Sequence, residues 1–170
     1  MTQAIGPVVK IVSGGQAGVD RAALDLAIMR GLPHGGWCPK GRTAEDGLIE
    51  SRYDLQETES AGYRQRTRQN VVDSDGTLIL NLGELSDGTL TTQRFAERFG
   101  KPCLVVQLES GAEGIRQTRE WLQAHRIATL NVAGPRESKR PGIHRQAIAY
   151  LNGLAEFDCD LPCVGGERTA

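Results

Sequence analysis

Seven residues near the N-terminus combine the residue types of an anion-binding turn. Residues 14–20 read Gly-Gly-Gln-Ala-Gly-Val-Asp, directly after a short β-branched segment and directly before a stretch with helical periodicity. Glycines allow positive φ and let main-chain N–H groups approach a ligand closely. A helix that begins here directs its unpaired N–H groups and partial positive charge at the same place. We therefore expect phosphate or another oxyanion to contact Gly14, Gly15, Gln16, Gly18, Val19 and Asp20.

Residues 14–20 also allow a plainer interpretation. They differ from the Walker A loop, because no Gly-Lys-Ser/Thr follows, and from the Gly-x-Gly-x-x-Gly motif of dinucleotide-binding proteins. The segment is therefore either a ligand-binding loop or a tight turn between a strand and a helix. Asp20 either holds a ligand hydroxyl or braces the loop.

A second segment rich in glycine and hydroxyl groups repeats this arrangement. Residues 81–92 read Asn-Leu-Gly-Glu-Leu-Ser-Asp-Gly-Thr-Leu-Thr-Thr, between a strand pattern and a helical pattern. Thr89 suits the N-cap position, but three threonines at one helix start exceed the need of a single cap. If the two helix N-termini are adjacent, they form a two-sided anion cradle. The candidate ligand contacts here are Asn81, Gly88, Thr89, Thr91 and Thr92.

A third candidate segment carries three cations. Residues 134–142 read Gly-Pro-Arg-Glu-Ser-Lys-Arg-Pro-Gly and follow the last strand pattern. Arginine binds phosphate or oxo groups with a planar, bidentate fork. We expect Gly134, Arg136 and Ser138 to contact the ligand; the alternative is a solvated, charged loop.

A helix predicted over residues 61–74 has little apolar surface. Arg64 and Arg68 lie four apart and share one of its faces. Another face carries Tyr63, Thr67 and Asn70. Such a helix is either supported by a ligand or a neighbouring subunit, or it faces solvent. Lys40 adds positive charge before it, and we expect Lys40 and Arg68 to contact the ligand.

An alternation of strands and helices must position these segments. Strands are predicted over residues 8–13, 32–38, 77–82, 103–108 and 129–133, with helical spacing after each. This alternation favours a parallel sheet covered on both faces. We predict a single doubly wound, Rossmann-like α/β domain over residues 1–157, with a mostly parallel sheet of about five strands. Residues 158–170 are expected to be a flexible tail.

The predicted connections are asymmetric. Helix-to-strand links are short, whereas strand-to-helix links are longer and rich in glycine, hydroxyl and charged residues. The longer links span residues 14–20, 39–60, 81–89, 109–114 and 134–141. All of them leave the carboxyl ends of strands, where doubly wound sheets bind ligands. Residues 39–60 are too many for an ordinary connection, so we expect them to be functional or to carry irregular structure of their own.

Composition excludes several classes of protein. The chain is 39% hydrophobic and 24% charged with a net charge of -1, which argues against a general nucleic-acid binder. The longest apolar runs are about five residues, whereas a membrane span needs roughly 20. The first residues lack signal-peptide features, so we expect a cytoplasmic protein. The histidines and cysteines are dispersed, and Cys159 and Cys163 lack further ligands, so we predict no metal site and no catalytic triad.

Several blocks of the sequence resemble one family. Besides residues 13–20, these are Tyr53-x-Leu55-x-Glu57-Thr58, Arg66-Thr67-x-x-Asn70-Val71, Ser74-Asp75-Gly76-Thr77, Gly88-Thr89 and the segment from Leu130 to Ser138. Together they span nearly the whole chain. The chain resembles the molybdenum carrier family, a branch of the SLOG, or lysine-decarboxylase-like, superfamily of Rossmann-like proteins.

The resemblance implies a non-catalytic protein that stores the molybdenum cofactor and hands it to apo-molybdoenzymes. The cofactor, a pterin with a dithiolene-bound oxo-molybdenum and a terminal phosphate, would be bound cargo. Its anionic groups suit the glycine loops and cations described above, and no protein ligand to the metal is needed. The resemblance also implies a homo-oligomer, since characterised relatives are commonly tetramers.

Two alternatives come from the same superfamily. Some SLOG enzymes are nucleoside-monophosphate phosphoribohydrolases with a Pro-Gly-Gly-x-Gly-Thr-x-x-Glu loop, and here Thr92 stands where the glutamate would be. A threonine cannot replace a carboxylate in glycosidic cleavage, although Asp87 or Glu84 could substitute. Other SLOG proteins sense nucleotide-derived ligands such as ADP-ribose, and the same cradle would serve them.

Overall fold

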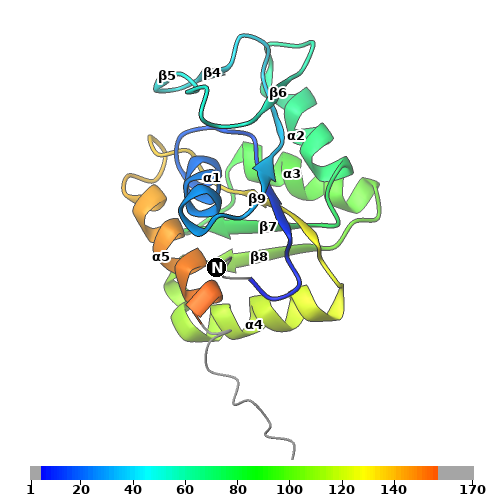
Figure 1. Cartoon of the computed structure of the whole chain (residues 1–170), viewed down its shortest axis with the longest axis vertical. Helices are drawn as coiled ribbons and strands as arrows, with labels where there is room; N and C mark the ends of the chain where they lie inside the picture. The colour runs from blue at the N-terminus through cyan, green and yellow to red at the C-terminus, as the bar shows by residue number, and fades with distance from the viewer. Residues whose placement is uncertain (1–4, 157–170) are drawn as a thin grey trace, which may run out of the picture.

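The structure is a computed structural model that describes residues 5–156 (Figure 1). The tail expected over residues 158–170, Cys159 and Cys163 lie outside the described residues. Within residues 5–156, no helix combines the length and apolar character that crossing a bilayer requires.

The five predicted strands form one central parallel sheet. Its strands are β1 (Lys10–Val12), β2 (His34–Gly35), β7 (Gly76–Asn81), β8 (Cys103–Gln107) and β9 (Thr129–Ala133). They lie in the order β2-β1-β9-β7-β8, and every neighbouring pair is parallel. The last strand in sequence therefore lies at the centre of the sheet, between β1 and β7. The predicted α/β fold is confirmed.

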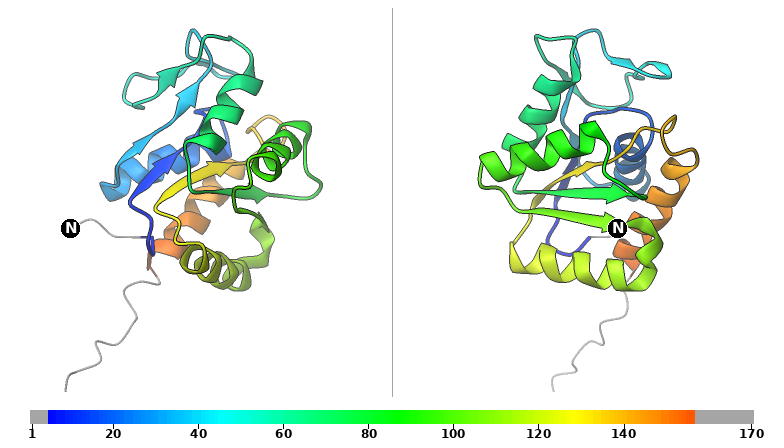
Figure 2. Two further views of the ribbon diagram at one scale, coloured as in Figure 1. Left: turned by 90° about the vertical axis from the view of Figure 1, so that its right-hand side faces the viewer. Right: turned by 180° about the vertical axis from the view of Figure 1, so that it is seen from behind.

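Helices cover both faces of this sheet, as a doubly wound fold requires (Figure 2). The helices are α1 (Val19–Arg30), α2 (Tyr63–Val72), α3 (Asp87–Arg98), α4 (Gly111–Ala124) and α5 (Ile143–Glu156), with a short 3-10 turn, η1 (Leu108–Ser110), before α4. The main hydrophobic core joins one face of the sheet to α1, α4 and α5. A smaller cluster joins α2 and α3 on the other face.

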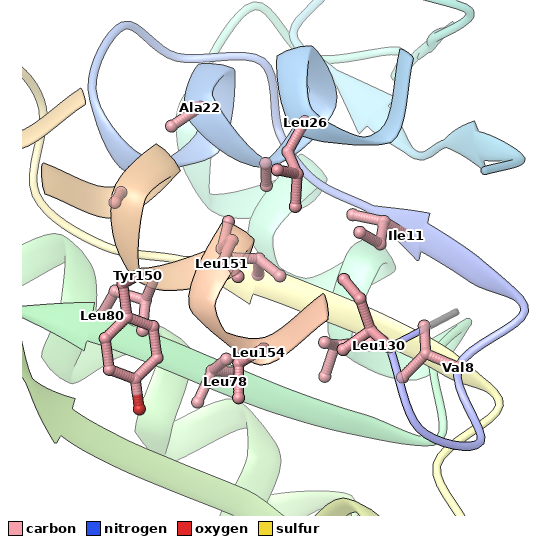
Figure 3. Packing of buried hydrophobic residues seen from close by; sticks show 14 of the residues in the cluster. Val8, Ile11, Ala22, Leu26, Leu78, Leu80, Leu130, Tyr150, Leu151 and Leu154 are labelled. Carbon is pink, nitrogen blue, oxygen red and sulfur yellow. The ribbon is translucent and has the colours of Figure 1, made fainter. Parts of the chain in front are cut away.

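The main core is built from alternate residues of the central strands. Leu78 and Leu80 of β7 pack with Leu151 and Leu154 of α5, while Leu26 of α1 packs beside them (Figure 3). All six residues of β7 are buried. A strand that is buried on both faces reads as a continuous apolar run, and this explains why residues 77–82 indicate a strand so clearly.

The predicted second strand, residues 32–38, is in fact two short strands. Gly36 separates them with a φ of 123°, and a Cβ there would lie 2.3 Å from the Ser13 carbonyl oxygen. The first part, β2, pairs with β1. The second, β3 (Trp37–Cys38), leaves the central sheet and pairs with β6 (Gln56–Glu57). The prediction missed this break because Gly36 gives no sign of which strand each side will join.

Residues 39–60 carry irregular structure of their own, as their length predicts. They include a small antiparallel hairpin of β4 (Thr43–Ala44) and β5 (Gly47–Leu48). The Arg42 guanidinium donates hydrogen bonds to four main-chain carbonyl groups, those of Ile49, Glu50, Tyr53 and Leu55. One side chain thus satisfies carbonyl groups of this segment that the strands of a longer β-hairpin would otherwise bind.

We predict that Leu151→Ala lowers the free energy of unfolding by about 2–5 kcal/mol, because it opens a cavity between α5 and the sheet. Val9→Ala is the control: its side chain is exposed, and the change should stay within about 0.5 kcal/mol. Urea unfolding measures both, and equal losses for the two variants would contradict this account of the core.

Candidate functional site

A pocket lies where strands β1 and β9 end and helix α3 begins. The space within it, with the open mouth included, is about 740 Å³. Helix α1 leaves β1 toward one face of the sheet, and α3 leaves β7 toward the other, so a crevice opens between them. The lining residues are Gly14, Gln16, Asp20, Tyr63, Arg66, Thr67, Asn70, Ser86, Gly88, Thr89, Thr92, Asn131, Val132, Ala133, Gly134, Pro135, Arg136 and Lys139.

The glycines of residues 14–20 are required by close packing of the protein itself. A Cβ on Gly14 would lie 1.5 Å from Nη1 of Arg66. Gly18, at a φ of 106°, would place a Cβ 2.5 Å from the Pro135 carbonyl oxygen. We expected these glycines to admit a ligand; in the structure, a side chain of α2 and the loop after β9 occupy the space beside them.

A buried ion pair crosses the site. Nη1 of Arg66 in α2 donates a hydrogen bond of 2.8 Å to Oδ2 of Asp20 in the first turn of α1. Burial raises the pKa of the Asp20 carboxyl above its usual value, and the neighbouring Arg66 guanidinium opposes that rise. Of the two roles left open for Asp20, bracing the loop is the one that the contacts of Oδ2 support.

Two residues that line the pocket each carry a buried donor atom with no hydrogen-bond partner among the described residues. The two atoms are Nε2 of Gln16 and Nε of Arg66. Oε1 of Gln16 accepts hydrogen bonds from the main-chain N–H groups of Ala17 and Glu45, so the amide is fixed with its NH2 group left over. A buried donor without an acceptor costs about 1–3 kcal/mol. An acceptor group on a bound molecule would remove that cost.

The start of helix α3 forms the opposite wall. Ser86, not Thr89, occupies the N-cap position, so that assignment of Thr89 was wrong. The Thr89 and Thr92 hydroxyls donate to carbonyl groups of their own helix turn, at Ser86 and Gly88. Neither α1 nor α3 has a side-chain hydrogen bond that caps its N-terminus. In α1, the N–H groups of Val19 and Arg21 already donate to the Pro135 and Gln16 carbonyl groups. Among the described residues, the first N–H groups of α3 are therefore the ones that remain available to a ligand.

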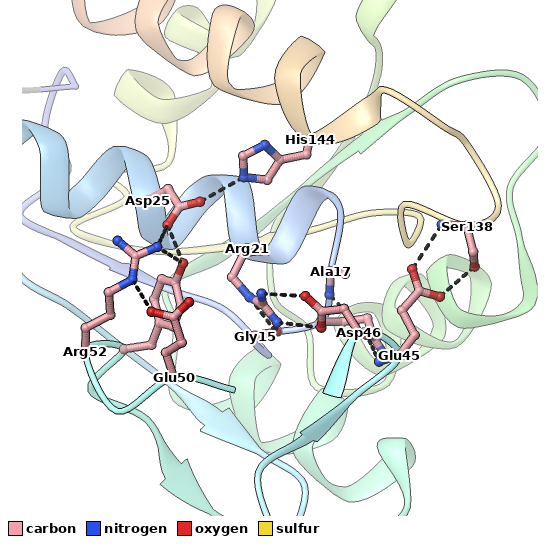
Figure 4. Close-up of polar contacts among 12 residues, drawn as sticks. Gly15, Ala17, Arg21, Asp25, Glu45, Asp46, Glu50, Arg52, Ser138 and His144 are labelled. Carbon is pink, nitrogen blue, oxygen red and sulfur yellow. Dashed lines mark hydrogen bonds and ion pairs between the residues drawn. The ribbon is translucent and has the colours of Figure 1, made fainter. Parts of the chain in front are cut away.

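Two arginine side chains lie close to the aromatic ring of Tyr63 at the pocket. The Arg66 and Arg136 guanidinium carbons lie 5.3 and 5.4 Å from the centre of the Tyr63 ring. Lys139 also lines the pocket. The Ser138 hydroxyl and main-chain N–H both donate to the Glu45 carboxylate (Figure 4). Oε2 of this carboxylate lies 3.9 Å from Nε of Arg136.

About half of the expected ligand contacts lie in the pocket. The expected residues that line it are Gly14, Gln16, Asp20, Gly88, Thr89, Thr92, Gly134 and Arg136. The expected residues that do not line it are Gly15, Gly18, Val19, Lys40, Arg68, Asn81, Thr91 and Ser138. Lys40 is exposed on the loop after β3, and Thr91 faces a separate hollow on the outer side of α3.

Arg66 is the principal residue that the sequence analysis did not select. Its spacing gave the signal, because it lies three residues after Tyr63 and four before Asn70, on the helix face that carries both. Other lining residues that were not selected as ligand contacts are Tyr63, Thr67, Asn70, Ser86, Asn131, Val132, Ala133, Pro135 and Lys139. Across residues 5–156, no cluster of three or more histidine, cysteine, aspartate or glutamate side chains is arranged to hold a metal ion.

A polar network behind the glycine loop holds α1 to its neighbours (Figure 4). The Tyr53 hydroxyl donates to Oδ1 of Asp25, and Nε2 of His144 lies 2.8 Å from Oδ2 of the same carboxylate. Arg52 donates to the Tyr53 hydroxyl. Asp25 of α1 thereby joins the long loop to α5, and burial with the Asp25 contact raises the pKa of Tyr53 to about 12.

Comparisons with known proteins support one family. The family model of the circularly permutated YpsA SLOG family matches residues 11–155. Among solved structures, the chain is similar to the crystal structure of a protein from Syntrophus aciditrophicus SB that is named putative molybdenum carrier protein. The two are 44% identical, with a TM-score of 0.85, over 88% of this chain and 96% of that chain. A comparison with curated proteins found no match.

We predict that Arg66→Met lowers the free energy of unfolding by about 3–5 kcal/mol, because it leaves the Asp20 carboxylate buried without its partner. Combining it with Asp20→Asn should restore much of the loss, since no buried charge then remains. Urea unfolding of the single and double variants measures this. Strictly additive losses would show that the two side chains do not interact.

We predict that Tyr53 makes the fold sensitive to alkali. The folded pKa of about 12 lies above the usual tyrosine pKa of 10.0, so the stabilising contribution is complete below pH 10 and is lost as pH rises toward 12. Tyr53→Phe should therefore flatten the fall in unfolding free energy between pH 10 and pH 12. An unchanged slope in this variant would assign the alkaline loss to other groups.

Proposed function

Because the chain belongs to the circularly permutated YpsA SLOG family, we propose that it binds the molybdenum cofactor in this pocket as cargo and releases it to apo-molybdoenzymes. The name of the similar Syntrophus aciditrophicus protein, a molybdenum carrier, supports this choice of cargo. The proposal includes assembly into a homo-oligomer, as the sequence resemblance implies. In this proposal the protein holds the cofactor by hydrogen bonds and charge and does not catalyse a reaction on it.

The observation that carries the proposal is the pair of unpartnered buried donors, Nε2 of Gln16 and Nε of Arg66. Both residues line the pocket, and the uncapped start of α3 lines it as well. Donors around one pocket suit an oxyanion such as the terminal phosphate of the cofactor. An apolar cargo would leave them unsatisfied.

The mouth of the pocket suits the other part of such a cargo. Tyr63 presents an aromatic face, and Arg136 and Lys139 add positive charge beside it. Planar heterocycles stack on aromatic rings, and cations favour an anionic ligand. In the proposed complex the phosphate lies at the helix starts and the pterin lies toward Tyr63.

The lining residues favour holding a ligand over cleaving one. Among the described residues that line the pocket, Asp20 is the one carboxylate, and Arg66 binds its Oδ2. Neither Glu84 nor Asp87 lines the pocket, so neither takes the position that Thr92 occupies. Glycosidic cleavage needs a carboxylate that acts as acid or base at the scissile bond. The residues that line the pocket therefore do not support the alternative function as a hydrolase.

The direct test is to purify the protein from cells with intact cofactor synthesis. The pterin is converted to its fluorescent form by acid-iodine oxidation and detected by chromatography, and molybdenum is measured by mass spectrometry. We expect pterin and molybdenum to co-purify in equal amounts. A bound nucleotide with neither of them would instead favour the sensor function, and release of base from nucleoside monophosphates would favour the hydrolase.

We predict that Gln16→Glu lowers the amount of bound pterin by about tenfold or more. A tenfold loss corresponds to about 1.4 kcal/mol of binding free energy. The new carboxylate can still accept the Ala17 and Glu45 N–H groups, but it replaces the unpartnered NH2 donor with a negative charge. Gln146→Glu, on the exposed surface of α5, is the control and should retain its pterin. Equal pterin in both variants would place the anion elsewhere.

A further inference from the structure

Four arginines gather where α2 and α3 pack side by side (Figure 2). Arg64 and Arg68 belong to α2, and Arg94 and Arg98 belong to α3. All four are exposed. We call this set the arginine face. Arg64, Arg94 and Arg98 line a hollow on the outer side of the two helices, separate from the candidate site.

Three of these arginines are held in place by aromatic rings. The Arg64 guanidinium lies 4.9 Å from the centre of the Phe95 ring. The guanidinium groups of Arg68 and Arg98 lie 5.0 and 5.9 Å from the centre of the Phe99 ring. Such cation–π contacts explain how a helix with little apolar surface packs against α3. They also hold these guanidinium groups in place at the surface, where the side chains remain exposed.

Within residues 5–156, no carboxylate pairs with any of the four guanidinium groups. Arg116 shows the usual arrangement, with ion pairs to Glu113 and Glu120 on its own helix. On each of the two helices, the two arginines of the arginine face are instead four residues apart, a spacing at which like charges repel each other. A chain with a net charge of -1 has thus concentrated positive charge on one face at some cost in stability.

The arginine face adjoins the mouth of the candidate site. The same two helices line the pocket with their next faces, through Tyr63 and Thr67 of α2 and through Thr89 and Thr92 of α3. Arg64 directly follows Tyr63 in the chain. A molecule bound to the arginine face therefore lies on the two helices that also line the pocket.

We propose that the arginine face docks an acidic, aspartate- and glutamate-rich surface of the protein that receives the cargo. The proposal rests on the proposed carrier function. Guanidinium groups bind carboxylates in a bidentate manner, so four exposed arginines, three of them held by aromatic rings, match an acidic protein surface well. A nucleic acid fits less well, because nucleic-acid-binding domains are strongly basic overall, whereas this chain has a net charge of -1.

The first test needs no cargo. In a titration followed by NMR at low salt, poly-L-glutamate should shift amide signals of α2 and α3 and bind at least about tenfold more weakly to the double variant Arg94→Glu, Arg98→Glu. The control variant Arg126→Glu, Arg145→Glu changes the net charge equally on other surfaces and should bind as the wild type does. Unfolding curves confirm that both variants fold.

Three results of this titration would overturn the proposal. The shifts could map outside α2 and α3, the control variant could lose binding equally, or a single-stranded oligonucleotide of the same charge could bind more tightly than poly-L-glutamate. The last result would assign the face to nucleic acid. A protein that carries no pterin would defeat the carrier function but would leave this titration fully interpretable.

The second test uses the cargo-loaded protein and a purified apo-molybdoenzyme. The double variant Arg94→Glu, Arg98→Glu should keep its pterin and molybdenum but reconstitute the enzyme at least about tenfold more slowly at low salt. Rising salt should slow transfer from the wild type toward the rate of the variant. Equal transfer rates for wild type and variant would show that the face plays no part in delivery.

Discussion

The candidate site depends on one buried ion pair, between Asp20 at the start of α1 and Arg66 of α2. These helices pack on opposite faces of the sheet, and the pair joins them across its carboxyl edge. Removing two charges from water is costly, and good geometry with further hydrogen bonds is needed to offset that cost. The pair also explains Gly14, because any side chain there would occupy the position of the guanidinium group.

The composition of α2 fits its part in this ion pair. With few apolar residues it cannot hold its position by hydrophobic burial alone, and it uses arginine at each turn: Arg66 toward the pocket, and Arg64 and Arg68 toward the aromatic rings of α3. Its inner side can therefore remain polar and line a ligand site. A more apolar helix would pack more simply but would supply fewer hydrogen-bond donors to the pocket.

The sequence predicts the fold well because strand and helix patterns are local. Residues 77–82 indicate a buried strand by composition alone, and the glycine and threonine segments mark where helices begin. What it could not predict are contacts between distant segments. Nothing local shows that Gly14 makes room for Arg66, that the Ser138 hydroxyl binds Glu45, or that Arg42 organises the long loop. The split at Gly36 belongs to the same class, because strand pairing is a tertiary choice.

The central position of β9 determines when the sheet and its pocket can be completed during synthesis of the chain. This strand pairs with both β1 and β7, yet it is the last of the five to leave the ribosome. Until it emerges, β1 and β7 have no common neighbour, and closing such distant contacts is the slow part of folding. Residues 131–136 also complete the wall of the pocket. The pocket is therefore complete only after nearly all of the domain has been translated, so its walls cannot come together in a shorter nascent chain.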